Sequence, residues 1–188
     1  SPVTVHMNTE ITDIKSLKAD EIVIATGAKP RTIKAPGGEK AVTATDYLFR
    51  KAEVGDKVVI IGGGLTGCEI ALELAKLGKH PIIVEQMEYL IKAKYVNAAN
   101  TNMLRDYIKY YNMPVYLESG VTEIKDGAVV IKDKNGKTQE VACDSVITSI
   151  GYIPGTPLAE KESKHVHMIG DANTVGNLKT VILAANDL

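Results

Sequence analysis

A glycine-rich turn between a buried strand and a helix is the feature that most restricts how this chain can fold. Residues 57–61 form an apolar run after one lysine, the pattern of a parallel strand covered on both faces. Gly62, Gly64 and Gly67 follow at once with the spacing GxGxxG, and an amphipathic helix begins at the last of them. A second apolar strand at residues 81–85 completes a βαβ unit, which is right-handed by the general rule.

The three glycines have separate expected tasks in such a unit. Gly62 allows the tight turn off the strand, Gly64 leaves room for a pyrophosphate, and Gly67 lets the helix pack close to the sheet. The free N–H groups at the helix N-terminus then attract the phosphates. The sequence therefore predicts that a dinucleotide is bound by the loop residues Gly62, Gly63, Gly64, Leu65, Thr66 and Gly67. A turn that binds nothing is the alternative, and the βαβ unit by itself is also compatible with FAD or S-adenosylmethionine.

Two acidic residues are candidates for contacts with the nucleotide. Glu85 ends the second strand, where a carboxylate accepts hydrogen bonds from the adenosine ribose hydroxyls of NAD(H). Its charge would repel the 2′-phosphate of NADP(H), and no Arg follows within five residues to attract it. We therefore expect a preference for NAD(H), the alternative being a solvated strand end. Glu69, one turn into the helix, has two open interpretations: it faces the nicotinamide or the flavin, or it is a first-turn acid that suits the helix dipole.

The remaining patterns predict a small α/β domain. A second helix is expected at about residues 98–111, where apolar residues recur at helical spacing. Asp-Gly at 126–127 and Asn-Gly at 135–136 predict hairpin turns and hence a three-stranded antiparallel meander. Residues 145–150 indicate another buried strand, whereas residues 29–38 have the turn residues of an exposed linker. The predicted fold class is α/β, a Rossmann-like domain with a parallel sheet and a small meander.

Four stretches carry a resemblance that spans nearly the whole chain: residues 22–30, 59–69, 150–154 and 167–172. Each is similar to a motif of the pyridine nucleotide-disulfide oxidoreductase superfamily, flavoproteins in which an NAD(P)H domain interrupts an FAD domain. In chain order they resemble the ATG stretch that leaves the FAD domain, the second glycine loop, the GxxP element that closes the NAD(P)H domain, and the motif that returns to the FAD domain.

The resemblance implies two sets of cofactor contacts. Gly151 of the closing element would lie against NAD, whereas the FAD of the parent protein would be contacted by Thr26, Gly27, Gly170 and Asp171. The implied domains are a partial FAD-binding domain in residues 1–40, an NAD(H)-binding domain in residues 41–155, and a return into the FAD-binding domain in residues 156–188.

The order of the motifs assigns the glycine loop to NAD(H). The loop follows the ATG stretch, so it matches the second loop of the family, and the first loop, which grips the ADP half of FAD, is not in the sequence. We therefore expect this chain to be a fragment of a longer protein.

The sequence of residues 65–69, followed by Ala71, is most similar to that of the 2-enoate reductase and 2,4-dienoyl-CoA reductase branch, the NADH:flavin oxidoreductases. Those enzymes carry an N-terminal barrel with FMN and an iron–sulfur cluster, and nothing of that barrel is in this sequence. The disulfide-reductase branch also has a Glu at the position of Glu69, and its dithiol would lie upstream of residue 1.

The function implied is delivery of hydride from NADH to a flavin, in which the protein binds and aims the nicotinamide while the cofactors supply the redox chemistry. No catalytic acid, base or nucleophile is assigned. We expect the parent to be an FAD-dependent NADH oxidoreductase, and the isolated chain to be inactive and not to retain FAD. The alternative is a non-catalytic nucleotide-sensing or structural Rossmann module. A methyltransferase would leave the ATG, GxxP and Gly-Asp elements unexplained.

Composition argues against other kinds of partner. Lys and Arg total 22 against 23 Asp and Glu, a balance without a basic surface for nucleic acid or an anionic membrane. No apolar run reaches the roughly 18 residues that span a bilayer, and a cytoplasmic protein is expected. The expected partners are a nucleotide and the flavin domain of the parent chain. The oligomeric state, a homo-oligomer included, stays open.

The cysteines and histidines predict no redox or metal site. Cys68 and Cys143 form no CxxC pair, and Cys68 is expected to pack as a small residue behind the loop, the alternative being a thiol with a lowered pKa at the helix start. His165 and His167 alternate along a predicted strand and would share one face, yet no third ligand is evident beside them, so no metal site is predicted.

Overall fold

The computed structural model describes residues 3–92, 97–155, 158 and 163–188. It divides into two compact units, Pro30–Gly151 and a smaller one made of Ser1–Lys29 with Tyr152–Leu188. The domain boundaries predicted from the sequence, 40/41 and 155/156, stay a prediction, and residue 156 lies outside the described part. Among the described residues, none of the helices is both long and apolar enough to cross a membrane.

A five-stranded parallel sheet forms the centre of the larger unit. Its order is β3 (Val42–Thr43), β10 (Ser145–Thr148), β4 (Lys57–Ile61), β5 (His80–Val84) and β6 (Val115–Tyr116). Every neighbouring pair is parallel. The predicted α/β class with a parallel sheet is thus confirmed, and the apolar runs read from the sequence are its central strands.

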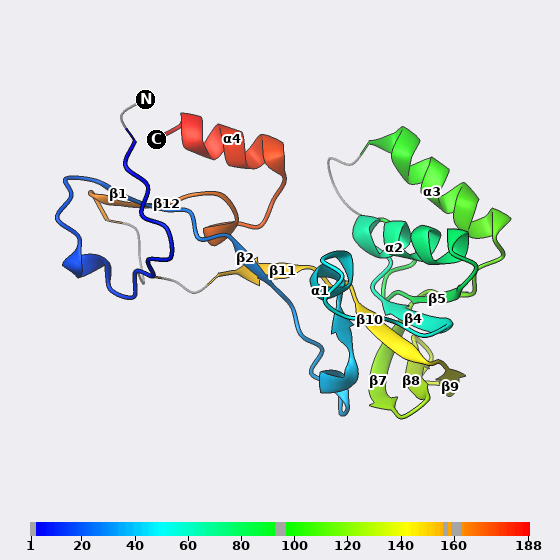
Figure 1. Cartoon of the computed structure of the whole chain (residues 1–188). Coiled ribbons are helices and arrows are strands. Elements are labelled where there is room, and N and C mark those ends of the chain that lie inside the picture. The colour runs from blue at the N-terminus through cyan, green and yellow to red at the C-terminus, as the bar shows by residue number, and fades with distance from the viewer. Residues whose placement is uncertain (1–2, 93–96, 156–157, 159–162) are drawn as a thin grey trace. The chain divides into compact units, whose positions relative to one another are not determined.

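The two faces of this sheet have different covers (Figure 1). Val58 and Ile60 of β4 point to a core shared with the helices α1 (Ala44–Leu48), α2 (Leu65–Lys76) and α3 (Ala98–Tyr110). Val59 and Ile61 point to a second core under the antiparallel meander of β7 (Ser119–Lys125), β8 (Ala128–Asp133) and β9 (Thr138–Ala142). Continuous apolar strands are needed because both faces are buried.

The predicted turns lie where the meander changes direction. Gly127 and Gly136 have φ values of +78° and +83°, a region that glycine adopts without strain. The expected linker is exposed in part, since Lys34 and Pro36 are exposed and the other residues of 33–38 are half-buried, but it is attached to the larger unit. Ile33 packs against the core under the meander, and the carbonyl of Pro36 accepts a hydrogen bond of 2.8 Å from the N–H of Ile124.

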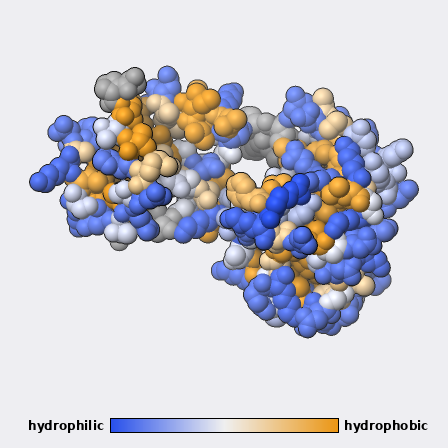
Figure 2. All heavy atoms as spheres, in the orientation of Figure 1, coloured by the Kyte–Doolittle hydropathy of each residue, from blue (hydrophilic) through white to orange (hydrophobic). Residues whose placement is uncertain are grey.

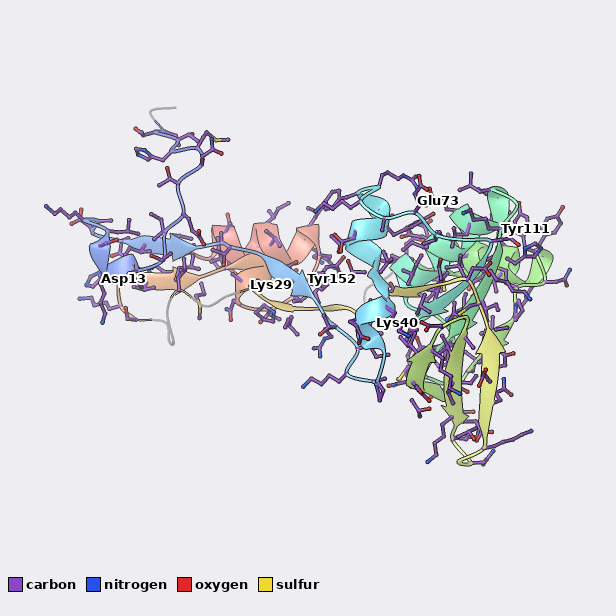
Figure 3. The ribbon with its side chains drawn as sticks, turned by 60° about the horizontal axis from the view of Figure 1, so that its bottom comes forward. Asp13, Lys29, Lys40, Glu73, Tyr111 and Tyr152 are labelled. Carbon is purple, nitrogen blue, oxygen red and sulfur yellow. The ribbon has the colours of Figure 1, made fainter. Side chains whose placement is uncertain are left out.

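The short helix η2 (Gly38–Lys40) follows this segment. Its Lys40, labelled in Figure 3, pairs with Asp126 at the β7–β8 turn. The segment that enters the larger unit is therefore fixed to the meander and is not a free connection.

The smaller unit contains little core. β1 (Ile22–Ile24) pairs in parallel with β12 (Val166–Met168), and β2 (Ala28–Pro30) pairs with β11 (Tyr152–Pro154). The short helices η1 (Ile14–Ser16) and η3 (Gly170–Ala172) and the helix α4 (Leu178–Asn186) complete it. Among its described residues, Ile24 is the only fully buried apolar side chain. Figure 2 shows apolar residues gathered on the surface of α4, where Leu178 and Ile182 are 83% and 67% exposed.

Candidate functional site

The glycine loop lies at the carboxyl ends of the central strands, where the direction of winding changes. From β4 the chain proceeds to β5 and β6 on one side, and it returns through β10 on the other side. Gly62 follows β4 directly, and its N–H donates to the carbonyl of Val84 at 2.8 Å. In open α/β sheets, ligands bind in the crevice at such a switch point.

A Cβ atom would meet different surroundings at each of the three glycines of the loop. Gly62 has a φ of +106°, and a Cβ there would lie 2.3 Å from the carbonyl oxygen of Ser149. A Cβ on Gly67 would lie 2.0 Å from the Gly62 carbonyl oxygen, so α2 approaches the loop closer than any side chain allows. A Cβ on Gly64 would meet nothing within 4 Å and would project into open space. That open side is where a ligand can approach the backbone.

The N-terminus of α2 faces this space without a side-chain cap. Gly64 is the N-cap, and no side-chain hydrogen bond caps the helix, all of whose residues are described. The intrahelical bonds begin with the Cys68 N–H, which donates to the Gly64 carbonyl at 3.0 Å. The amides of the first turn therefore remain available for an anion, in a position where the helix dipole is favourable.

Glu85 is joined directly to the glycine loop. Its Oε2 accepts a hydrogen bond of 2.6 Å from the N–H of Gly63, and its Oε1 accepts one of 2.8 Å from the N–H of Met87. Both oxygens are thereby oriented by backbone donors, and each retains lone-pair capacity for a hydroxyl. The structure thus brings together the two parts of the predicted NAD(H) site, the loop and the acid.

Glu69 lies beyond the first turn of α2. The first turn of α2, which is described throughout, contains no acidic residue, so the interpretation of Glu69 as a first-turn acid is wrong. Its exposed side chain lines a shallow depression between α2 and α3, which Leu72, Met103 and Glu73 (Figure 3) also line. The interpretation that it faces the nicotinamide or the flavin stays a prediction.

Cys68 is a packed thiol. Its side chain is fully buried, and its Sγ donates to the carbonyl of Gly63 at 3.4 Å. Burial, together with the charge of Glu85, raises the pKa of the Cys68 thiol to about 12. The alternative of a lowered pKa at the helix start is therefore wrong, because burial disfavours the charged thiolate.

The other predicted site residues fall into two groups. Gly151 ends the larger unit with a φ of +86°, and its carbonyl accepts from the N–H of Arg31 at 2.9 Å. The predicted FAD contacts lie in the smaller unit, where Thr26 and Gly27 follow β1 and Gly170 and Asp171 follow β12. Because β1 and β12 are parallel neighbours, these two pairs lie at the same sheet edge.

His165, directly before β12, and His167, within it, have a partner that the sequence did not reveal. His165 Nδ1 and His167 Nε2 lie 3.0 and 2.9 Å from the two carboxylate oxygens of Glu21. These hydrogen bonds lower the pKa of the Glu21 carboxyl group. In the described part of the chain, no cluster of three or more His, Cys, Asp or Glu is arranged to hold a metal ion.

Sequence reasoning also missed three residues around the loop: Leu90, Ile91 and Arg105. The N–H of Ile91 donates to the carbonyl of Gly63, and Arg105 donates to the carbonyl of Leu90. No local sequence pattern connects Leu90 and Ile91 with an arginine on the next helix.

Comparison with known proteins adds a family and several relatives. The pyridine nucleotide-disulphide oxidoreductase family matches residues 3–181. A cinnamate reductase from Clostridium sporogenes is 37% identical over 94% of this chain and 27% of its own length. An NADH oxidase from Thermoanaerobacter brockii is 33% identical over 88% of this chain and 27% of its own length.

A solved structure of a 2-naphthoyl-CoA reductase superposes with a TM-score of 0.72 at 30% identity, over 88% of this chain and 26% of that one. The chain thus spans about a quarter of the length of each of these three proteins.

Proposed function

The chain belongs to the pyridine nucleotide-disulphide oxidoreductase family, and from this we propose that its larger unit binds NADH and positions the nicotinamide for hydride transfer to FAD. The observation that carries the proposal is the hydrogen bond between the Gly63 N–H and Glu85 Oε2. It joins a phosphate-binding type of loop to a carboxylate suited to a ribose diol, and the two lie at one end of a parallel sheet.

The residues present fit a dinucleotide. The pyrophosphate would lie over Gly64, against the uncapped amides of Leu65 and Thr66. The adenosine ribose would donate from its hydroxyls to Glu85, and Gly151 would leave room for the nicotinamide half. Bound NADH supplies the hydride, and these residues bind and orient it. In this proposal residues 41–155 are the NAD(H)-binding domain.

The flanking segments 1–40 and 156–188 are proposed to belong to an FAD-binding domain, with Thr26, Gly27, Gly170 and Asp171 as its contacts. The similarity to reductases supports a further step, in which the whole protein is a reductase of the enoate or dienoyl-CoA kind. FMN and an iron–sulfur cluster would then lie outside this sequence.

A calorimetric titration of the chain with NADH tests the core of the proposal. We expect saturable binding with one site per chain, and competition by ADP-ribose, which shares the pyrophosphate and adenosine. The absence of binding would overturn the NADH site. Rapid mixing of the full-length protein with NADH tests the second part, since bleaching of the flavin absorbance distinguishes hydride transfer from a nucleotide-sensing module.

A further inference from the structure

The middle peptide of the glycine loop is held on both sides by the segment that follows β5. The N–H of Gly63 donates to Glu85, and the Gly63 carbonyl accepts from the N–H of Ile91 at 2.8 Å. The N–H of Met87 donates a hydrogen bond to the same carboxylate. Residues 85–91, called the clasp segment below, therefore contact the loop at the peptide that precedes Gly64.

The end of the clasp segment is buried and conformationally unfavourable. Leu90 and Ile91 are 8% and 3% exposed and pack in the core under the helices. Ile91 has a φ of +56°, in the left-handed region that β-branched residues rarely adopt. A Cβ on Gly63 would lie 2.4 Å from Leu90 Cδ2, so the loop and the segment interlock. A conformation of this kind persists only where surrounding contacts hold it.

Arg105 of α3 provides such a contact. Its Nε and Nη2 donate to the carbonyl oxygen of Leu90 at 3.2 and 2.7 Å. Its guanidinium also lies 5.6 Å from the ring centroid of Tyr89 in the same segment. A planar guanidinium directs both donors from one fixed fork, which the single ammonium of Lys does not reproduce.

We propose that Arg105 is a positioning residue for the nucleotide: its grip on the Leu90 carbonyl keeps the clasp segment on the glycine loop and so holds the Glu85 carboxylate and the Gly63–Gly64 peptide in the geometry that binds NADH. This inference rests on the proposed NADH site. Arg105 acts through the loop and the carboxylate. When the competent arrangement is populated only in part, the apparent affinity falls by the same fraction.

The test compares Arg105→Ala and Arg105→Lys with Lys109→Ala in the 188-residue chain. Lys109 lies one turn further along α3 and is exposed, so its removal changes the charge equally without touching the clasp segment. We expect Arg105→Ala to raise the Kd for NADH about tenfold, as a competent population of about one tenth would. Arg105→Lys should recover part of the loss, and Lys109→Ala should leave the Kd unchanged.

Two further measurements separate positioning from a general loss of structure. Hydrogen exchange without ligand should be faster at the amides of Gly63 and Ile91 in Arg105→Ala, with strands β4 and β5 unchanged. In a Glu85→Ala background, Arg105→Ala should weaken binding by much less than tenfold, because one group through which it acts is gone.

Equal losses in Arg105→Ala and Lys109→Ala, or unchanged exchange at the two loop amides, would overturn the proposal. If Arg105→Ala does not fold, Arg105→Lys provides the same comparison. Failure of the unaltered chain to bind NADH would instead overturn the proposed function, and the exchange measurement, which needs no ligand, still decides whether Arg105 holds the loop.

Discussion

At the scale of single residues, Glu85 combines two roles that are usually considered separately. It accepts a hydrogen bond from the Gly63 N–H of the glycine loop, and in the proposed site it would also accept hydrogen bonds from the ribose hydroxyls. We predict that NADH binds more tightly than NADPH, because a 2′-phosphate would lose the hydroxyl hydrogen bond and meet a negative charge. The difference should be roughly 1–3 kcal/mol. Calorimetric titration with both nucleotides measures it, and equal or reversed affinities would contradict the prediction.

Gly64 and Gly62 are a matched pair for testing where the phosphates lie. Gly64→Val should abolish NADH binding with the fold largely intact, since its Cβ meets no protein atom but occupies the proposed pyrophosphate space. Gly62→Val should instead lower the free energy of unfolding, because Gly62 has a positive φ and lies against Ser149. Urea unfolding and NADH titration of both variants distinguish the effects. Unchanged affinity in Gly64→Val would show that the loop is not the site.

Cys68 should be inert in the folded chain. Since its pKa is raised to about 12, the thiol stays protonated at pH 8 and should react with a disulfide reagent only after unfolding. Folding favours the protonated form, so this contribution to stability is complete below the unfolded pKa of about 8.5 and is lost as the pH rises toward 12. Thiol titration with and without denaturant checks the first point, and rapid labelling of the native chain at Cys68 would refute it.

At the scale of elements, the sequence predicted what is encoded locally. The strand–turn–helix–strand unit at β4, α2 and β5 and the hairpins at Gly127 and Gly136 were readable because glycine spacing and apolar period specify them over a few residues. The conformation of the clasp segment could not be predicted from the sequence. Ile91 has none of the Gly or Asn signals of a left-handed residue, and the bond from Arg105 forms only when α3 packs beside the sheet. The same holds for Glu21, whose histidine partners are 144 and 146 residues away in the sequence.

The contact between α2 and the loop yields a prediction at this scale. Gly67→Ala places a methyl group 2.0 Å from the carbonyl oxygen of Gly62, which is backbone and cannot rotate away. The helix must shift, and overpacking of this kind costs about 1–3 kcal/mol. Urea unfolding should show this loss of stability, even though alanine has a higher intrinsic helix propensity than glycine. A variant as stable as the parent chain would mean that α2 is less tightly seated than described.

At the scale of the whole molecule, the resemblance read from four motifs is confirmed by the family match over residues 3–181. The motifs identified the family because each one reflects a backbone requirement, such as the open side of Gly64. They did not reveal how unevenly the core is distributed. The larger unit has two apolar cores, whereas the smaller unit buries one apolar side chain among its described residues.

This uneven core leads to the prediction that the purified chain carries no stoichiometric FAD and is colourless. The one GxGxxG sequence in the chain lies in the larger unit, and the flavin contacts predicted in the smaller unit are Thr26, Gly27, Gly170 and Asp171. A few polar groups on a two-stranded sheet with little core do not offset the cost of immobilising a large flexible ligand. Absorbance after gel filtration in excess FAD measures retention. A flavin band near one equivalent per chain would contradict the prediction and would indicate that a second chain completes the pocket.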